Sequence, residues 1–169
     1  MYKSRYSVIS LALLAVVAAT VAVPARGAEQ QGELIAVLQS DAPPAEKAIT
    51  CKRLAIYGDK EAVPTLAALL PNAELASWAR IALEAIPDPE AGEALCGAID
   101  DLEGRLLIGV INSVGIRREA KAVDQLAGRL KDADSGVGAA AAPARGRIAG
   151  APAAKVWVGG RAGAPEKYP

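Results

Sequence analysis

The chain contains no histidine and no phenylalanine among its 169 residues. Without histidine it cannot build a Ser-His-Asp or Cys-His catalytic arrangement, a histidine-ligated zinc or haem site, or the usual proton shuttle near neutral pH. The CxxC, GxGxxG and GxxxxGK[ST] patterns are also missing, which excludes zinc ribbons, covalent haem attachment and these nucleotide-binding loops. We therefore expect no catalytic, cofactor-binding or metal-binding residues, and a protein that is not an enzyme.

Aromatic residues and cysteines are scarce. Four tyrosines and two tryptophans leave a core of Leu, Ile, Val and Ala, which suits thin helical layers. Cys51 and Cys96 fall in predicted units that are separated by a whole further unit, whereas a disulfide needs Cα atoms within about 7 Å. We expect two buried, free thiols that act as small apolar residues.

The N-terminus has the pattern of an export signal. Lys3 and Arg5 precede an uncharged, largely apolar run over residues 8–23, and small residues follow it. We expect a signal peptide over residues 1–27, cut before Ala28 or, as an alternative, after Ala25, which would place the mature protein in the periplasm or outside the cell. The alternative is an uncleaved membrane anchor, although the run is shorter than the ~20 residues that span a bilayer. Contact with a membrane is expected through this segment alone.

The charge balance argues against nucleic acid as a partner. The chain has 19 basic and 19 acidic residues, and removal of Lys3, Arg5 and Arg26 with the signal peptide leaves 16 basic residues. The mature chain would then carry about −3, whereas proteins that bind nucleic acid neutralise phosphates with positive charge.

A sequence repeat with a 29-residue period runs through the middle of the chain. Residues 59–63 (DKEAV) return in altered form at residues 88–92 (DPEAG), and Glu61, Glu90 and Glu119 keep the same spacing. A repeat of this length is typical of stacked pairs of helices.

Each repeat unit is predicted to hold two helices. Gly58, Pro87, Gly115 and Gly150 should end the second helix of each unit, because glycine adopts left-handed backbone readily and proline cannot continue a helix. The predicted helix pairs span residues 32–39 with 43–57, 60–70 with 73–85, 89–99 with 102–114, and 119–131 with a helix from about 135 to Gly150.

Apolar residues recur at helical spacing. Three stripes follow i, i+3 and i+4 steps, and no segment of this region shows sustained strand alternation, so we predict an all-α fold. The alternative to stacked pairs is a helical bundle without repeat symmetry. The stripes are Leu75, Ala79, Leu83 and Ile86; Leu107, Val110, Ile111 and Val114; and Val123, Leu126, Ala127 and Leu130.

The repeat resembles a known family. Residues 57–66 (YGDKEAVPTL) and 83–91 (LEAIPDPEA) are similar to the HEAT-repeat pattern, in the short form named after phycobilisome lyases, over roughly residues 32–150. The resemblance implies an α–α superhelix, or solenoid, of about four helical hairpins over residues 28–150. Such superhelices bind other macromolecules along one surface.

The fourth unit departs from the family pattern. Pro143 lies inside its second helix, Arg145 replaces the leucine at the contact between units, and glycines at 136, 138 and 146 weaken the helix further. We expect a degenerate last hairpin that is poorly ordered from about residue 135, and a Gly/Pro-rich, disordered tail over residues 151–169. The chain would then be a truncated form of a longer repeat protein.

Candidate partner-binding residues come from the resemblance, because the second helices generally line the binding face of HEAT proteins. Tryptophan and arginine are the residues most enriched at interface hot spots. As an alternative, Trp78 could fill the contact between units. Arg80 and Arg105 could instead form ion pairs with Glu84 or Glu103. The candidates are Trp78, Arg80, Arg105, Arg117 and Arg118.

Two groups of acidic residues lie at predicted turns, at Asp100, Asp101 and Glu103 and at Asp132 and Asp134. We expect them to cap the helices that follow, with calcium binding and acid–base catalysis as the alternatives.

Together these features predict a non-enzymatic, exported scaffold that binds an unidentified protein. The alternatives are an accessory module of a larger exported enzyme, either lyase-like or redox-associated, and a fragment of a longer repeat protein.

Overall fold

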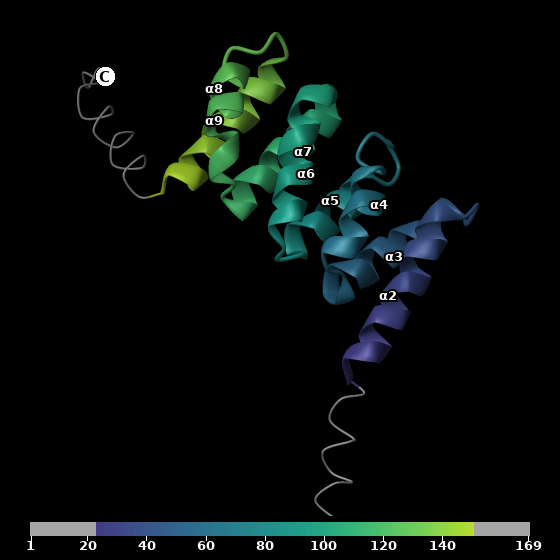
Figure 1. The fold of residues 1–169 in the computed structure, drawn as a ribbon. Coiled ribbons are helices and arrows are strands. Elements are labelled where there is room, and N and C mark those ends of the chain that lie inside the picture. Colours follow the sequence, from purple (N-terminus) through teal and green to yellow (C-terminus); the bar gives the residue numbers. More distant parts are fainter. Residues whose placement is uncertain (1–22, 151–169) are drawn as a thin grey trace, which may run out of the picture.

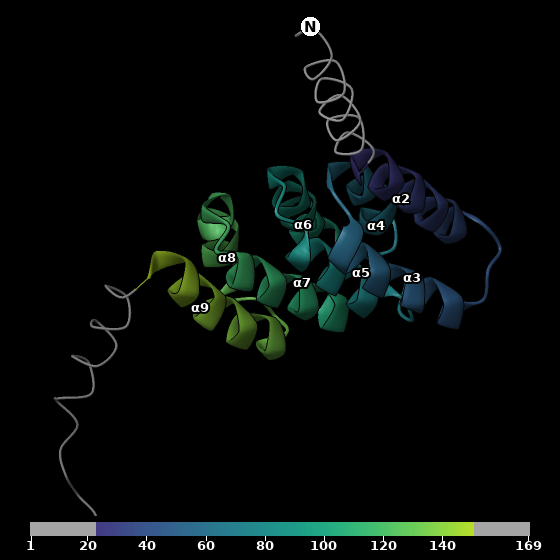
Figure 2. The same ribbon diagram turned by 90° about the horizontal axis from the view of Figure 1, so that it is seen from below.

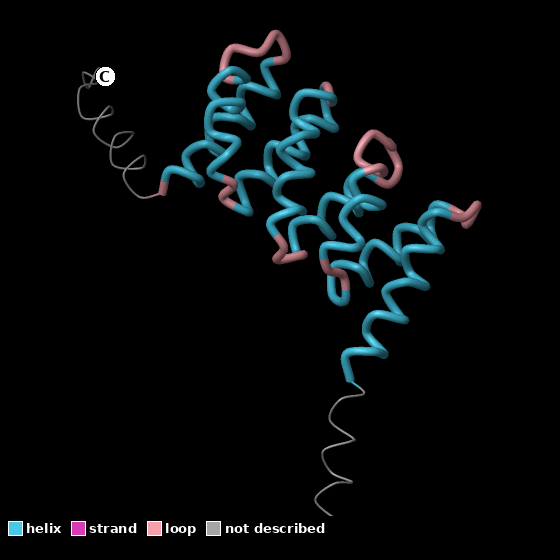
Figure 3. The backbone as a smooth tube through the Cα atoms, in the orientation of Figure 1, coloured by secondary structure: helices cyan, strands magenta, loops and turns pink. Residues whose placement is uncertain are grey.

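The computed structural model describes residues 23–150, and their side chains from residue 30 onward. This part of the chain is all-α and contains eight α-helices and two short 3-10 helices, with no strand (Figures 1 and 3). In chain order they are α2 (Val23–Gln39), α3 (Pro44–Tyr57), η1 (Lys60–Ala62), α4 (Val63–Ala67), α5 (Ala76–Ala85), α6 (Pro89–Asp101), α7 (Gly104–Arg117), η2 (Ala120–Ala122), α8 (Val123–Arg129) and α9 (Ser135–Ala149).

The helices pack in adjacent pairs and form two rows. The chain advances from one end of the molecule to the other (Figure 1), and each helix packs mainly on its neighbours in sequence and on the helix two places along. Figure 2 shows α2, α4, α6 and α8 along one side, which we call the first-helix layer. The helices α3, α5, α7 and α9 lie along the other side and form the second-helix layer.

Several helices begin or end where a capping side chain or a proline predicts it. Asp59 accepts a hydrogen bond from the backbone N–H of Glu61 at 2.8 Å and so caps the segment that follows it. Helix α5 ends at Ala85, and Ile86 adopts extended backbone, as the residue before a proline prefers. Helix α2 begins at Val23, nine residues before the predicted start at Gly32.

The core lies between the two layers and is made almost wholly of aliphatic side chains. The first two predicted stripes are buried along their full length, and Leu83, Ile111 and Val114 are completely inaccessible. The third stripe is buried only at Leu126, while Leu130 is 38% exposed. The periodicity therefore located the core helices correctly and overestimated burial in α8.

Gly115 does not end a helix, which corrects the prediction. Helix α7 continues to Arg117, and Arg118 adopts the left-handed backbone that ends it, with φ of 58°. Gly115 is instead a point of close approach, since a Cβ atom there would lie 2.8 Å from the Cα of Ala144 in α9. The glycine is needed for contact between neighbouring second helices.

Helix α9 is continuous, although the sequence predicted poor order from about residue 135. Val137, Ala140, Ala141 and Ala144 are buried on one face, and that face packs against α7. Arg145, which was expected either to extend to solvent or to be buried as a charge, is exposed, and Ala144 occupies the buried position beside it.

Pro143 lies on the exposed side of α9, and so does Ala139, whose carbonyl group loses its helical donor. Water can satisfy that carbonyl, yet the proline still interrupts the hydrogen-bond ladder and crowds the preceding turn. We expect Pro143→Ala to raise the free energy of unfolding by about 1–3 kcal/mol, less than the full helix-interior penalty because alanine also adds entropy to the unfolded chain. Urea unfolding measures this change, and a loss of stability would show that α9 is not a regular helix in solution.

Both cysteines are buried and free, as predicted. Burial raises the pKa of the Cys51 thiol to about 11 and raises the pKa of Cys96 as well. Neither thiol is therefore ionised near neutral pH, which agrees with a packing role.

No helix within residues 23–150 is long and apolar enough to cross a membrane. Most of the predicted signal peptide and the whole of the predicted tail over residues 151–169 lie outside the described residues.

Candidate partner-binding surface

A groove opens between α3 and α5 on the outer side of the second-helix layer. Its volume is about 580 Å³, and most of its lining is apolar. Ile49 is 56% exposed and Trp78 is 39% exposed, so both large side chains remain open to solvent. We call this the α3–α5 groove, and its lining residues are Pro44, Ala45, Ala48, Ile49, Lys52, Glu74 and Trp78.

Further exposed apolar side chains lie on the same two helices. Ile56 in α3 is 74% exposed and Ile81 in α5 is 44% exposed. Single exposed apolar residues are common on soluble proteins, whereas several of them near an apolar groove are a reason to consider an interaction surface. The groove and its surroundings are the best candidate for contact with a partner.

The two layers carry opposite charge. The second helices hold eight basic residues and two acidic ones, Glu46 and Glu84, whereas the first helices together with η1 and η2 hold four basic residues and eight acidic ones. The basic residues of the second helices are Lys47, Lys52, Arg53, Arg80, Arg105, Arg117, Arg145 and Arg147.

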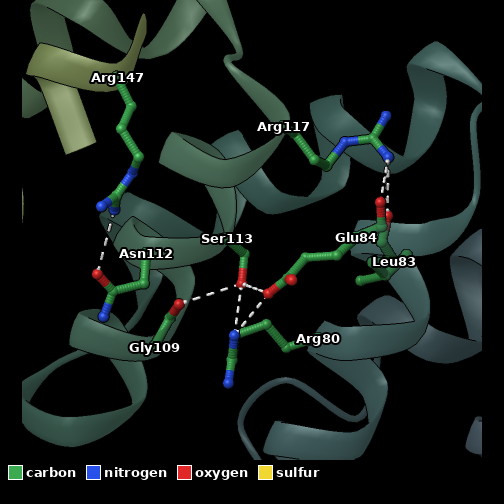
Figure 4. A network of polar contacts seen from close by, with 8 residues as sticks. All are labelled: Arg80, Leu83, Glu84, Gly109, Asn112, Ser113, Arg117 and Arg147. Atoms are coloured by element: carbon green, nitrogen blue, oxygen red, sulfur yellow. Dashed lines mark hydrogen bonds and ion pairs between the residues drawn. The ribbon is translucent and has the colours of Figure 1, made fainter.

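Arg80 is held in a polar cluster between α5 and α7 (Figure 4). Its Nη1 atom lies 2.6 Å from Glu84 and 2.8 Å from the Ser113 hydroxyl, and Ser113 donates to the Glu84 carboxylate. The side chain also lies against Gly109, where a Cβ atom would come within 3.2 Å of Nε. The predicted ion pair between Arg80 and Glu84 is confirmed, and the Arg80 side chain fixes the contact between two second helices.

Arg117 is also engaged within the protein. Its guanidinium group donates to the carbonyl oxygens of Leu83 at 2.9 Å and Glu84 at 3.2 Å (Figure 4), and also to those of Ile86 and Asp88. It pairs with Glu119 at 2.8 Å. The carbonyl groups at the C-terminal end of a helix have no partner within that helix, so Arg117 caps α5 from the neighbouring unit.

The remaining two candidates are exposed and lie at opposite ends of α7. Arg105 is in the first turn and forms no ion pair with Glu103 or with any other described residue. Arg118 follows the last turn. The five predicted residues do not form one site, since Trp78 lines the α3–α5 groove while Arg80 and Arg117 make interhelical contacts.

The two acidic groups have separate structural roles. Asp134 caps α9 by accepting from the backbone N–H of Gly136 at 2.8 Å, as expected. Asp100 accepts from Gln125 and lies 3.6 Å from Arg129, while Glu103 makes no capping bond through its side chain. Within residues 23–150, no three His, Cys, Asp or Glu side chains are grouped so that they could hold a metal ion.

Two lining residues of the groove, Ile49 and Glu74, were not predicted, whereas Lys52 was among the polar second-helix positions expected on a binding face. One signal was available, because Ile49 and Trp78 are 29 residues apart and so occupy equivalent positions of adjacent units. A second signal was the charge of alternate predicted helices, which can be counted without coordinates.

The chain matches none of the known protein-family models, and no similar protein was found among curated proteins.

Proposed function

We propose that this protein is a non-enzymatic scaffold that binds another protein through the outer side of its second-helix layer. The α3–α5 groove carries this proposal, since it is apolar, open, and bordered by exposed Ile49 and Trp78. Tryptophan is strongly enriched at the centres of protein interfaces. A groove with this apolar lining offers a place for an apolar side chain of the partner.

The proposal includes a HEAT-like superhelix. The 29-residue period and the packing of second helices on one another, α3 on α5, α5 on α7 and α7 on α9, support that architecture. In such a repeat array each unit contacts its neighbours, so an elongated surface is available to one partner.

The proposal also places the protein outside the cytoplasm, on the strength of the N-terminal basic residues and the apolar run that follows them. The measurement is the intact mass of the protein recovered from the periplasm or the medium of its native host. A chain that begins at Ala28 supports export, and a full-length chain confined to the cytoplasm overturns it.

Site-specific photocrosslinking tests the binding surface. A photoreactive residue at Ile81, in the second-helix layer, is compared with one at Glu90, an exposed position of α6 in the first-helix layer. We expect a discrete crosslinked protein from position 81 alone, and a weaker product when Trp78→Ala is present in the same chain. Equal yields from both positions, or no product from position 81, would contradict the proposed surface.

A further inference from the structure

We propose that the partner presents an acidic segment to the second-helix layer and that an apolar side chain of this segment enters the α3–α5 groove. This inference rests on the proposed function, and it specifies the chemistry of the partner.

The charge of the second-helix layer is largely unneutralised. Only Arg80 and Arg117 of its eight basic residues form an ion pair with another described residue. Of the other six, all but Lys47 are exposed. These exposed basic side chains favour an acidic partner surface, since like charges placed opposite one another cost several kcal/mol and reduce the rate of encounter.

Lys52 and Glu74 determine how a ligand would lie in the groove. Both line it, and neither forms an ion pair with another described residue. Lys52 lies one helical turn beyond Ala48 on α3, whereas Glu74 precedes α5 on the other side. An acidic group of the ligand would pair with Lys52, and the ligand's apolar side chain would contact Ile49 and Trp78 between the two charges.

A protein segment fits this surface better than a nucleic acid does. Phosphates would use the basic residues alone and leave Ile49, Ile56 and Ile81 exposed to water. Proteins that bind single-stranded nucleic acids stack successive bases on a series of aromatic side chains. Among the described residues of this layer, the exposed aromatic side chains are those of Tyr57 and Trp78. An acidic segment with aliphatic side chains uses both the charge and the apolar groove.

The test uses four fluorescein-labelled probes and the full chain. The first is an acidic peptide with leucines at helical spacing, the second replaces its Glu residues by Lys, and the third replaces its leucines by Ser. The fourth is an oligothymidylate of similar length. Anisotropy measures binding at low and moderate salt, and the emission of Trp78 is followed in a Trp157→Phe background.

We expect only the acidic, leucine-containing peptide to bind and to shift Trp78 emission to shorter wavelength, with weaker binding as salt rises. Lys52→Glu should weaken binding about tenfold or more. The matched control is Lys60→Glu, which makes the same charge change at an exposed position of η1, directly before α4, and should leave binding unchanged. Circular dichroism establishes that both variants are folded.

The inference is overturned if the Lys peptide or the oligothymidylate binds at least as tightly as the acidic peptide. It is also overturned if Lys52→Glu and Lys60→Glu weaken binding of the acidic peptide equally, or if no probe binds. The proposed function survives these outcomes if photocrosslinking from position 81 still captures a protein with Trp78 dependence. If crosslinking from position 81 fails while the acidic peptide binds, the scaffold proposal fails and the acid-binding surface stands.

Discussion

Replacing Leu83 with alanine is expected to lower the free energy of unfolding by about 2–5 kcal/mol. Leu83 is completely inaccessible in α5, and α5 packs against both α3 and α7. Removal of its side chain would lose the transfer free energy of the buried methyl and methylene groups, and would leave a cavity that neighbouring units cannot easily close. Urea unfolding followed by circular dichroism measures the change.

The matched control is Leu130→Ala, the same substitution at a residue that is 38% exposed. We expect a loss of about 1 kcal/mol or less there, because less apolar area leaves water when the protein folds. If the two substitutions cost the same, Leu83 does not lie in the core and the assignment of α5's buried face is wrong.

The contrast between these two leucines shows what helical periodicity can predict. The stripes through Leu83 and Ile111 identified buried faces correctly, because α5 and α7 have helices on both sides. The same spacing in α8 gave a partly exposed stripe, since α8 belongs to the last pair and no further pair covers it within the described residues. Periodicity identifies a helical face, and only the packing of neighbours decides how deeply it is buried.

Glycine and arginine were the residues that sequence reasoning placed least well. Gly115 has the spacing of a helix stop, but its role is to let Ala144 approach, and that depends on a residue 29 positions away. Arg145 was aligned with a core position, although the buried face of α9 passes through Ala144. Both errors arose because the roles of small residues in α9 are set by contact with α7.

The candidate site was predictable in part. Trp78 was identified from residue type and helix position, and the opposite charges of the two layers follow from the sequence once alternate helices are assigned. The groove itself was not predictable, because it depends on how Pro44, Ala45 and Ile49 of α3 lie against the start of α5. The interhelical role of Arg117 was not predictable either, since the sequence does not show that its guanidinium group reaches the end of α5.

Arg117→Ala is expected to lower the free energy of unfolding by about 2–4 kcal/mol, because it removes several hydrogen bonds to backbone carbonyl groups and the partner of Glu119. The side chain of Arg117 is only 11% exposed, so water cannot fully replace these bonds. Arg117→Lys should recover part of the loss, since an ammonium group keeps the charge but cannot span the carbonyls as the guanidinium fork does.

Arg118→Ala is the control for the Arg117 variants, because Arg118 is the exposed neighbour and forms no ion pair with another described residue. We expect a change within about 0.5 kcal/mol there. The loss in Arg117→Ala should persist in high salt, because most of its bonds go to backbone dipoles and lie largely out of solvent. A loss that disappears with salt would assign Arg117 to the surface charge of the second-helix layer and return it to the set of candidate partner-binding residues.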